Sequence, residues 1–366
     1  MVKDNEAQTG LHAFFSMENK KLKKMKKIYF ISLVLLVALA SCKNQEWDFP
    51  DYKYTTVYFA YQYPVRTITL GEDIFDNTLD NEHKCEIMAT TGGVYENKKD
   101  IIIDVTVDNS LSNGLLFGQG GDQIIPMPGN YYNLASNQIV IPKGQLSGGV
   151  VVELTDAFFA DTLALKKTYV IPMYMTQVVN ADSILSGTPL VNNPNRCVAT
   201  DWSVVPKDYI LYAIKYINSW HGYYLRRGTD VLTGKNGNTS LDTTIVRHQH
   251  YVENDAVFQL TTRSLTKTVY PLIIKDSQGH NVDCTLILTF DDAGKCTVSS
   301  NTSNCTATGS GQFVKKGEKN SWGNTDRDAI YLNYEVDLSE MHVATKDTLV
   351  SRNRGVVMET FSPLPK

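Results

Sequence analysis

The chain has 366 residues, enough for two domains of ordinary size, and a formal net charge of −4. The part before Cys42 carries seven lysines and three acidic residues, so the remainder of the chain has a net charge of −8. Nucleic acids and anionic membrane surfaces both favour a basic protein face. The composition therefore argues against either as the main partner, and it makes a heavily sulfated glycan a poorer ligand than a neutral one.

The segment from Met25 to Cys42 has the pattern of an export signal. Lys26 and Lys27 precede an apolar run from Ile28 to Ala38, and Leu39-Ala40-Ser41-Cys42 matches a lipobox. A run this short cannot span a bilayer, which needs about 20 apolar residues. We therefore predict a signal peptide over residues 1–41, with Met25 as an alternative start, and lipid attachment at Cys42. An ordinary secretory signal followed by an unmodified cysteine is the alternative.

A polar leader follows over residues 42–53 and includes Glu46, Asp48 and Asp51. It resembles the acidic tract that follows the lipidated cysteine in Bacteroidetes lipoproteins exported to the cell surface. This resemblance implies an outer-membrane protein that is held by its lipid anchor alone and faces the extracellular side. A periplasm-facing anchor is the alternative.

Residues 54–187 show the alternation and residue types that are typical of β-strands. Turn pairs such as Gly92-Gly93 and Pro128-Gly129 separate the strand segments, because glycine tolerates a positive φ. One modest helical candidate runs from Asp156 to Leu165. We predict an Ig-like β-sandwich over 54–187, followed by a linker over residues 188–207. The expected strands of this domain are 55–63, 101–107, 138–141, 149–154 and 169–177.

A second series of strands begins at Asp208 and defines a second domain over residues 208–366. The first of its strands alternates, with Ile210, Tyr212 and Ile214 on one face. Hairpin turns are expected at 276–279 and 291–294. This even, up-and-down spacing favours a lipocalin-like β-barrel, which closes its own sheet edges. The other expected strands are 243–252, 256–262, 268–274, 282–290, 295–299, 312–315 and 329–336.

The cysteines leave the disulfide pairing open. If Cys42 carries lipid, five cysteines remain, and at least one of them has no partner within the chain. No CxxC spacing occurs, which removes the common zinc and redox motifs. Cys296 and Cys305 flank a polar turn and would face each other across a hairpin; buried free thiols are the alternative.

Two blocks of sequence resemble a known family. Residues 141–187, which begin IPKGQLSGG, resemble part of an N-terminal β-sandwich domain of unknown function, and the resemblance covers residues 54–187. That domain occurs in Bacteroidetes lipoproteins encoded in polysaccharide utilisation loci. Residues 215–228, with Gly311 to Val314 and Trp322 to Asn324, resemble its companion C-terminal domain, a compact β-barrel. The resemblance implies a place beside an outer-membrane glycan importer, and it supplies no ligand or catalytic residues.

No catalytic or metal motif emerges from the sequence. A glycosidase needs two carboxylates about 5 to 9.5 Å apart, and the DxxDxDxE strand of chitinase-like barrels is absent. His248 and His250 would share one face of a strand, but a metal site would need a third ligand. The acidic loop over residues 73–82 is interpreted as solvated rather than as a calcium site. We predict that the protein is not an enzyme and binds no cofactor or metal.

Aromatic residues provide the case for sugar binding, because the apolar face of a sugar ring stacks on indole or phenol while its hydroxyls need amide and carboxylate partners. For Trp220 the alternative to sugar binding is a structural role, in which the side chain closes one end of a barrel. Trp322 lies in a loop region beside polar residues. The candidate glycan-binding residues are Trp322, Asn324, Asp326, Trp220, Tyr223 and Tyr224.

The sequence thus predicts an outer-membrane lipoprotein that binds a polysaccharide or oligosaccharide at the cell surface for uptake, without cleaving it. Its expected partners are the glycan importer and neighbouring lipoproteins. The alternative is an adhesin-like or structural subunit that docks a transporter or a neighbouring lipoprotein. A third hypothesis is an apolar-ligand carrier, which requires an open barrel lumen lined by apolar side chains.

Overall fold

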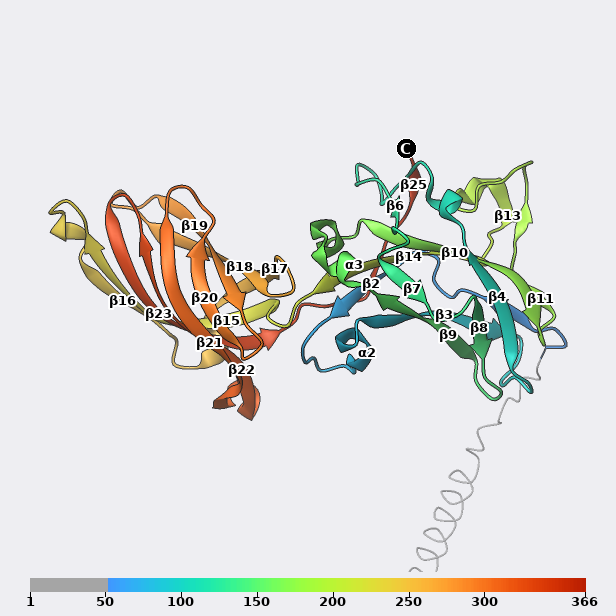
Figure 1. Cartoon of the computed structure of the whole chain (residues 1–366), viewed down its shortest axis with the longest axis horizontal. Coiled ribbons are helices and arrows are strands. Elements are labelled where there is room, and N and C mark those ends of the chain that lie inside the picture. The colour runs from blue at the N-terminus through green and yellow to red at the C-terminus, as the bar shows by residue number, and fades with distance from the viewer. Residues whose placement is uncertain (1–51) are drawn as a thin grey trace, which may run out of the picture. The chain divides into compact units, whose positions relative to one another are not determined.

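The computed structural model describes residues 52–366, so the predicted signal peptide, Cys42 and nearly all of the leader lie outside the described residues. The described chain is almost entirely β-structure, and its strands form a sandwich and a barrel (Figure 1). These architectures confirm the fold class predicted from the sequence.

The first sheet of the sandwich has five strands in the order β11-β1-β3-β9-β7. Strand β3 shows the alternation that the sequence predicts, because Cys85, Ile87 and Ala89 are buried and their neighbours are not. The strands are β1 (Thr56–Tyr58), β3 (Lys84–Gly92), β7 (Tyr132–Leu134), β9 (Ser147–Leu154) and β11 (Ser183–Ile184).

The second sheet has the order β24-β2-β14-β10-β4-β8, with β6 paired to β10. Strand β14 is central, and all but one of its nine residues are buried, as expected for a strand covered on both faces. The strands are β2 (Pro64–Thr69), β4 (Ile101–Val107), β6 (Ile125–Pro126), β8 (Gln138–Ile141), β10 (Tyr169–Val179), β14 (Tyr209–Ile217) and β24 (Glu359–Thr360).

Short elements complete the sandwich region. The predicted helix at 156–165 forms as two turns, α3 (Asp156–Ala160) and the 3-10 helix η2 (Thr162–Leu165). Its buried side chains, Phe158 and Phe159, pack in the sandwich core. The other short elements are β5 (Leu115–Leu116), β12 (Thr188–Pro189), β13 (Trp202–Val204), β25 (Leu364–Pro365), α2 (Thr78–Asn81), η1 (Asn109–Ser112) and η3 (Ala199–Asp201).

The sandwich core lies between the inward faces of the two sheets. Val57 and Ile87 from the first sheet and Ile68, Ile103 and Ile171 from the second are fully buried in one cluster. Each such side chain contributes roughly 1.5 to 3 kcal/mol relative to an exposed position. The core therefore fixes which face of every strand points inward, as the alternating sequence requires.

The barrel is an eight-stranded ring that closes where β15 pairs with β23. An additional strand, β16, pairs with β15 beside this ring. The strands are β15 (Gly222–Gly234), β16 (Thr243–Arg247), β17 (Ala256–Thr262), β18 (Lys267–Lys275), β19 (Asn281–Phe290), β20 (Lys295–Ser300), β21 (Thr306–Ser321), β22 (Thr325–Asp337) and β23 (Met341–Asn353), with the 3-10 helices η4 (Thr239–Leu241), η5 (Val252–Asn254) and η6 (Trp322–Asn324).

The boundary between the two domains differs from the prediction. The strand expected to open the barrel, β14, belongs to the sandwich, where it pairs with β10 and β2. After β23 the chain also returns to the sandwich, because β24 pairs with β2 and β25 with β5. Alternation identified β14 as a strand, but it cannot assign a strand to a sheet. The barrel strands therefore lie between residues 222 and 353, between two strands of the sandwich.

The connections between sandwich and barrel are tied by one partly buried side chain, that of Arg354. Its guanidinium donates to four backbone carbonyls, those of Leu70 and Glu72 after β2 and those of Asn218 and His221 between β14 and β15, over 2.6 to 3.0 Å. Burial lowers the pKa of Arg354. The cation is therefore held by backbone dipoles that converge from two segments of the chain, the loop after β2 and the connection between β14 and β15.

The interior of the barrel contains a buried ionic cluster centred on Asp347. Its carboxylate accepts hydrogen bonds from Arg226 at 3.1 Å, Arg247 at 2.7 Å, Tyr270 at 3.1 Å and Tyr334 at 2.8 Å. Arg226 is 6% exposed and Asp347 is 3% exposed. Apolar side chains fill the rest of the interior. This arrangement disagrees with the open apolar lumen that a lipid carrier needs.

The disulfide joins Cys284 and Cys305, not Cys296 and Cys305. In the β20–β21 hairpin Cys296 lies opposite Gly311, six residues beyond Cys305, which corresponds to about 20 Å along the strand. Cys305 instead lies 6.0 Å from Cys284, measured between Cα atoms. Cys296 remains a buried free thiol.

Removing the carboxylate of Asp347 should strongly destabilise the barrel. Asp347→Ala leaves two arginines without their shared buried acceptor, and the loss of one partner of a buried ion pair costs about 3 to 5 kcal/mol. The free energy of unfolding, measured by urea denaturation, should fall by this amount. Asp337→Ala, which removes a half-exposed partner of Lys235 in the same barrel, should cost less than about 1 kcal/mol. Equal losses would contradict this account.

His221 should make the protein less stable in mild acid. Its Nδ1 accepts the Thr262 N–H at 3.0 Å, and burial next to Arg354 lowers its pKa to about 4. Because the unfolded chain takes up a proton near pH 6.5 and the folded chain does not, stability should fall as the pH drops from about 6.5 to 4, by about 3 kcal/mol.

The measurement is the urea midpoint across this pH range. His221→Gln should flatten the decline, whereas replacing the exposed His248 by Gln should leave it unchanged. The same slope in all three proteins would show that His221 is not the group responsible.

Candidate functional site

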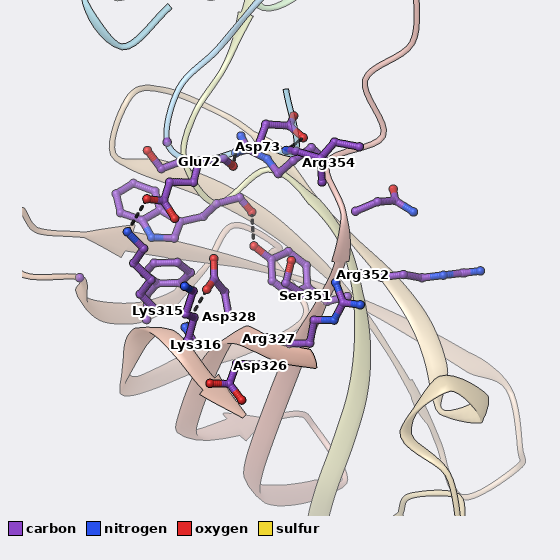
Figure 2. Close-up of a pocket in the computed structure, with 18 of the residues that line it drawn as sticks. Glu72, Asp73, Lys315, Lys316, Asp326, Arg327, Asp328, Ser351, Arg352 and Arg354 are labelled. Carbon is purple, nitrogen blue, oxygen red and sulfur yellow. Dashed lines mark hydrogen bonds and ion pairs between the residues drawn. The ribbon is translucent and has the colours of Figure 1, made fainter. Parts of the chain in front are cut away.

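A cavity of about 790 Å³ opens where one end of the barrel meets the loop after β2 (Figure 2). The loop contributes residues 71–74, and the connection into β15 contributes Ser219 and Trp220. The remaining walls come from the β19–β20 turn, from the long β21–β22 hairpin and from the end of β23. Arg354, which ties these connections together, is also part of the lining.

Four aromatic side chains line the cavity: Trp220, Tyr224, Phe313 and Trp322. Trp220 is stacked on Phe290, with ring centroids 4.1 Å apart and an angle of 7° between the rings. The Tyr224 hydroxyl donates to the Trp220 carbonyl at 3.0 Å. These contacts fix Trp220 and Tyr224 relative to each other and to the end of β19.

Two observations about Trp220 favour different roles for this residue, one structural and one in binding. Its stacking on Phe290 agrees with the structural role that was weighed from the sequence. Its indole N–H, however, is buried and has no hydrogen-bond acceptor among the described residues. An unpaired buried donor lowers the stability of the folded protein by about 1 to 3 kcal/mol. A purely apolar side chain could stack on Phe290 without this loss of stability.

Trp322 is fixed from two sides. Its indole N–H donates to the Ser351 carbonyl at 3.1 Å, and the Arg327 guanidinium lies 3.5 Å from its ring centroid. Gly323 follows with a φ of +70°, a conformation that glycine adopts at little cost and that turns the chain back into β22. One face of the indole is therefore covered by Arg327.

The rim of the cavity is polar and charged (Figure 2). Lys315 forms an ion pair with Glu72, so the barrel hairpin and the loop after β2 meet across the rim. The Lys316 backbone N–H donates to Asp328 at 2.7 Å. The backbone N–H of Asn320, together with Lys319, lowers the pKa of Asp326. Charged pairs of both signs thus surround the aromatic lining.

The structure brings together four of the six candidate residues from the sequence. Trp220, Tyr224, Trp322 and Asp326 line the cavity. Tyr223 does not, because successive strand residues point to opposite faces and Tyr224 takes the inner one. Asn324 also lies outside the lining, exposed, with a φ of +53°.

Sequence reasoning missed Phe313, Lys315 and the segment at 71–74. Phe313 lies in one of the blocks that carry the family resemblance, and its place in a strand was predicted. Lys315 in the same strand is 243 positions from Glu72 along the chain, so the meeting of these two residues at one rim is a property of the folded protein.

The geometry of the described residues does not support the metal sites that were considered from the sequence. Among residues 52–366, no group of three metal-binding side chains comes together. His248 and His250 lie beyond the end of β16 rather than on a strand. Asp80 of the acidic loop is buried, and it accepts the Thr69 N–H at 2.8 Å and pairs with Arg66. Within the same described range, no helix is both long and apolar enough to cross a bilayer.

Comparison with known families covers most of the described chain. The family model for a domain of unknown function, DUF5627, matches residues 219–355, which contain the barrel. A second family model, described as an N-terminal domain, matches residues 52–182, which contain most of the sandwich. The limits of both models agree with the placement of β14 outside the barrel.

No curated protein matches the chain. A Bacteroides ovatus crystal structure provisionally described as a carbohydrate-binding protein aligns with 84% of this chain and 98% of its own, but its identity is 13% and its TM-score 0.25, too low to equate the folds. A second Bacteroides ovatus crystal structure, of unknown function, is 48% identical with a TM-score of 0.81, over 87% of this chain and 100% of its own. The chain therefore belongs to the same family as this Bacteroides ovatus protein of unknown function.

Proposed function

We propose that this protein is an outer-membrane lipoprotein, anchored through Cys42 and facing outward, that binds glycan for polysaccharide uptake without cleaving it. The observation that carries the proposal is the cavity with its aromatic lining and polar rim. Its volume of about 790 Å³ lies within the range of small-molecule sites, roughly 300 to 1,000 Å³. One or a few sugar units would fill this volume. These units would belong to the end or to a bend of a longer glycan.

The chemistry of the lining fits a saccharide better than an apolar ligand. Sugar rings present C–H groups to an aromatic surface and hydroxyl groups to charged or amide side chains. Trp220 and Phe313 supply the first kind of contact, and Asp328 and Lys316 supply the second. Weak binding of this kind is strengthened when many copies act on one surface.

A binding role without catalysis agrees with the state of two of the five carboxylates that line the cavity. A glycosidase needs a general acid whose pKa is raised. The pKa of Asp326 is lowered by the Asn320 N–H and by Lys319, which is the opposite shift. Glu72 is engaged by Lys315. Neither of these carboxylates is arranged as a general acid.

The alternative, docking of a transporter or neighbouring lipoprotein, is favoured by one apolar patch. Ile74, Phe75, Val357 and Met358 are each more than two-thirds exposed. Phe75, Val357 and Met358 lie around a shallow depression beside β2. Large exposed apolar side chains that gather in one place are typical of protein contact sites.

Affinity electrophoresis against plant, host and microbial polysaccharides tests the proposal. We expect retardation on at least one glycan, and Trp322→Ala should weaken it about tenfold, or roughly 1.4 kcal/mol, because the indole is lost from the cavity. Tyr61→Ala, which removes an exposed tyrosine of the sandwich, should bind as the unchanged protein does. No retardation across a broad panel would favour docking of a partner protein.

The structure also separates residues within the predicted set. Asn324→Ala and Tyr223→Phe lie outside the cavity lining, so each should leave glycan affinity within about twofold. Phe313→Ala, at a position that the sequence did not single out, should weaken binding several-fold. Isothermal titration with the glycan found by electrophoresis measures all three. Weakening by Asn324→Ala but not by Phe313→Ala would place the ligand on the hairpin tip and not in the cavity.

A further inference from the structure

One end of the sandwich presents an unusual concentration of exposed tyrosines. Tyr52 is 79% exposed, Tyr54 is 56% exposed and Tyr95 is 64% exposed. Leu146 nearby is 44% exposed. Side chains of this size are normally turned inward, and tyrosine in particular combines an apolar ring with a polar hydroxyl group. We call this end of the sandwich, residues 52–54, 92–100 and 142–146, the tyrosine edge.

Backbone hydrogen bonds hold the three segments of the tyrosine edge together. The Tyr52 N–H donates to the Gly93 carbonyl at 2.8 Å, and the Thr91 N–H donates to the Leu146 carbonyl at 2.9 Å. The Gly144 N–H donates to the Asn97 carbonyl at 3.0 Å. A Cβ at Gly93 would lie 2.2 Å from the Tyr54 carbonyl oxygen, so the close approach of two segments requires glycine. The exposed rings are therefore presented by an ordered surface.

The charge of the tyrosine edge contrasts with that of the whole protein. Its exposed lysines, Lys53, Lys98, Lys99 and Lys143, have no carboxylate partner among the described residues. Its two exposed acids are Glu96 and Asp100, and Asp100 is occupied by the Lys143 backbone N–H at 2.8 Å. The edge is thus basic, whereas the chain from Cys42 onward has a net charge of −8.

The tyrosine edge also lies where the chain enters the sandwich. Cys42 precedes Tyr52 by ten residues, and ten residues span at most about 35 Å. If Cys42 carries lipid, Tyr52 is therefore never far from the membrane that holds the anchor. Tyrosine and lysine are the side chains that favour the headgroup layer of a bilayer, the first by its amphipathic ring and the second by its charge.

We propose that the tyrosine edge rests on the headgroup layer of the membrane and binds its anionic lipid groups, in addition to the anchor at Cys42. The proposal rests on the proposed lipidation and is independent of the glycan ligand. It differs from the prediction that the lipid anchor is the only membrane contact. It also gives the sandwich a defined side toward the membrane.

Lysine footprinting tests this contact. The full chain is expressed in a bacterial host that processes lipoproteins, and acylation of Cys42 is checked by mass spectrometry. The protein is then placed in vesicles of phosphatidylethanolamine and phosphatidylglycerol and treated with a water-soluble amine reagent. Lys53, Lys98 and Lys99 should react roughly fivefold more slowly on vesicles than after release into neutral detergent, because the headgroup layer covers them. The exposed barrel lysines Lys275 and Lys295 are internal controls that should not change.

Three further measurements make the result decisive. Replacing Tyr52, Tyr54 and Tyr95 together by Ser should remove the protection of the lysines. Salt at about 0.5 M should remove the part of the protection that depends on charge, because it screens the attraction between lysines and anionic headgroups. Trp322→Ala should leave the protection intact, so failure of glycan binding and failure of this contact are observed separately. Acylated, vesicle-bound protein whose edge lysines react as fast as in detergent would overturn the proposal. Absence of the acyl group on Cys42 would also overturn it.

Discussion

The hydrogen bonds of Arg354 are the constraint on which the arrangement of the candidate site depends. One guanidinium binds carbonyls of the loop after β2 and of the connection between β14 and β15. Arginine suits this position because its five N–H donors lie in one rigid plane and keep their charge when buried. A lysine would supply one point of contact, and the two segments would lose their common partner.

This constraint has a direct consequence for the cavity. Arg354 follows β23, and Ser351 of the same strand accepts the hydrogen bond of the Trp322 indole. Glu72, whose carbonyl binds Arg354, also pairs through its side chain with Lys315 on the opposite rim. The exposed Lys315–Glu72 pair is worth little energy on its own. The hydrogen bonds of Arg354 to backbone carbonyls, rather than the surface ion pair, therefore determine where the rim lies.

The barrel interior explains why its end, and not its centre, is available to a ligand. The carboxylate of Asp347 gathers arginine and tyrosine groups from several strands, and apolar side chains fill the remaining space. A buried ionic cluster of this kind adds little stability over a well-packed apolar core, but removing one member is costly. The cluster therefore keeps the strands in register and leaves the aromatic end of the barrel as the accessible surface.

A glycan receptor at a cell surface needs an orientation as well as a site. The cavity is built from barrel strands and the loop after β2, while the tyrosine edge is built from the segments around Gly93 and Leu146 in the sandwich. The two surfaces use different residues, so one can change without the other. The proposed capture of glycan and the proposed contact with the membrane thus depend on separate parts of one chain.

The sequence by itself determined the class of fold, because alternating residues and glycine turns depend only on local backbone geometry. It also identified Trp220, Tyr224, Trp322 and Asp326 as chemically suitable residues, since residue type is enough for that. Only the tertiary structure decided that β14 belongs to the sandwich, that Cys305 pairs with Cys284, and that Phe313 and Glu72 share a cavity. Each of these depends on which distant segments meet. Packing decides that, together with the contacts of Arg354, which lies 284 positions from its partner Leu70 along the chain.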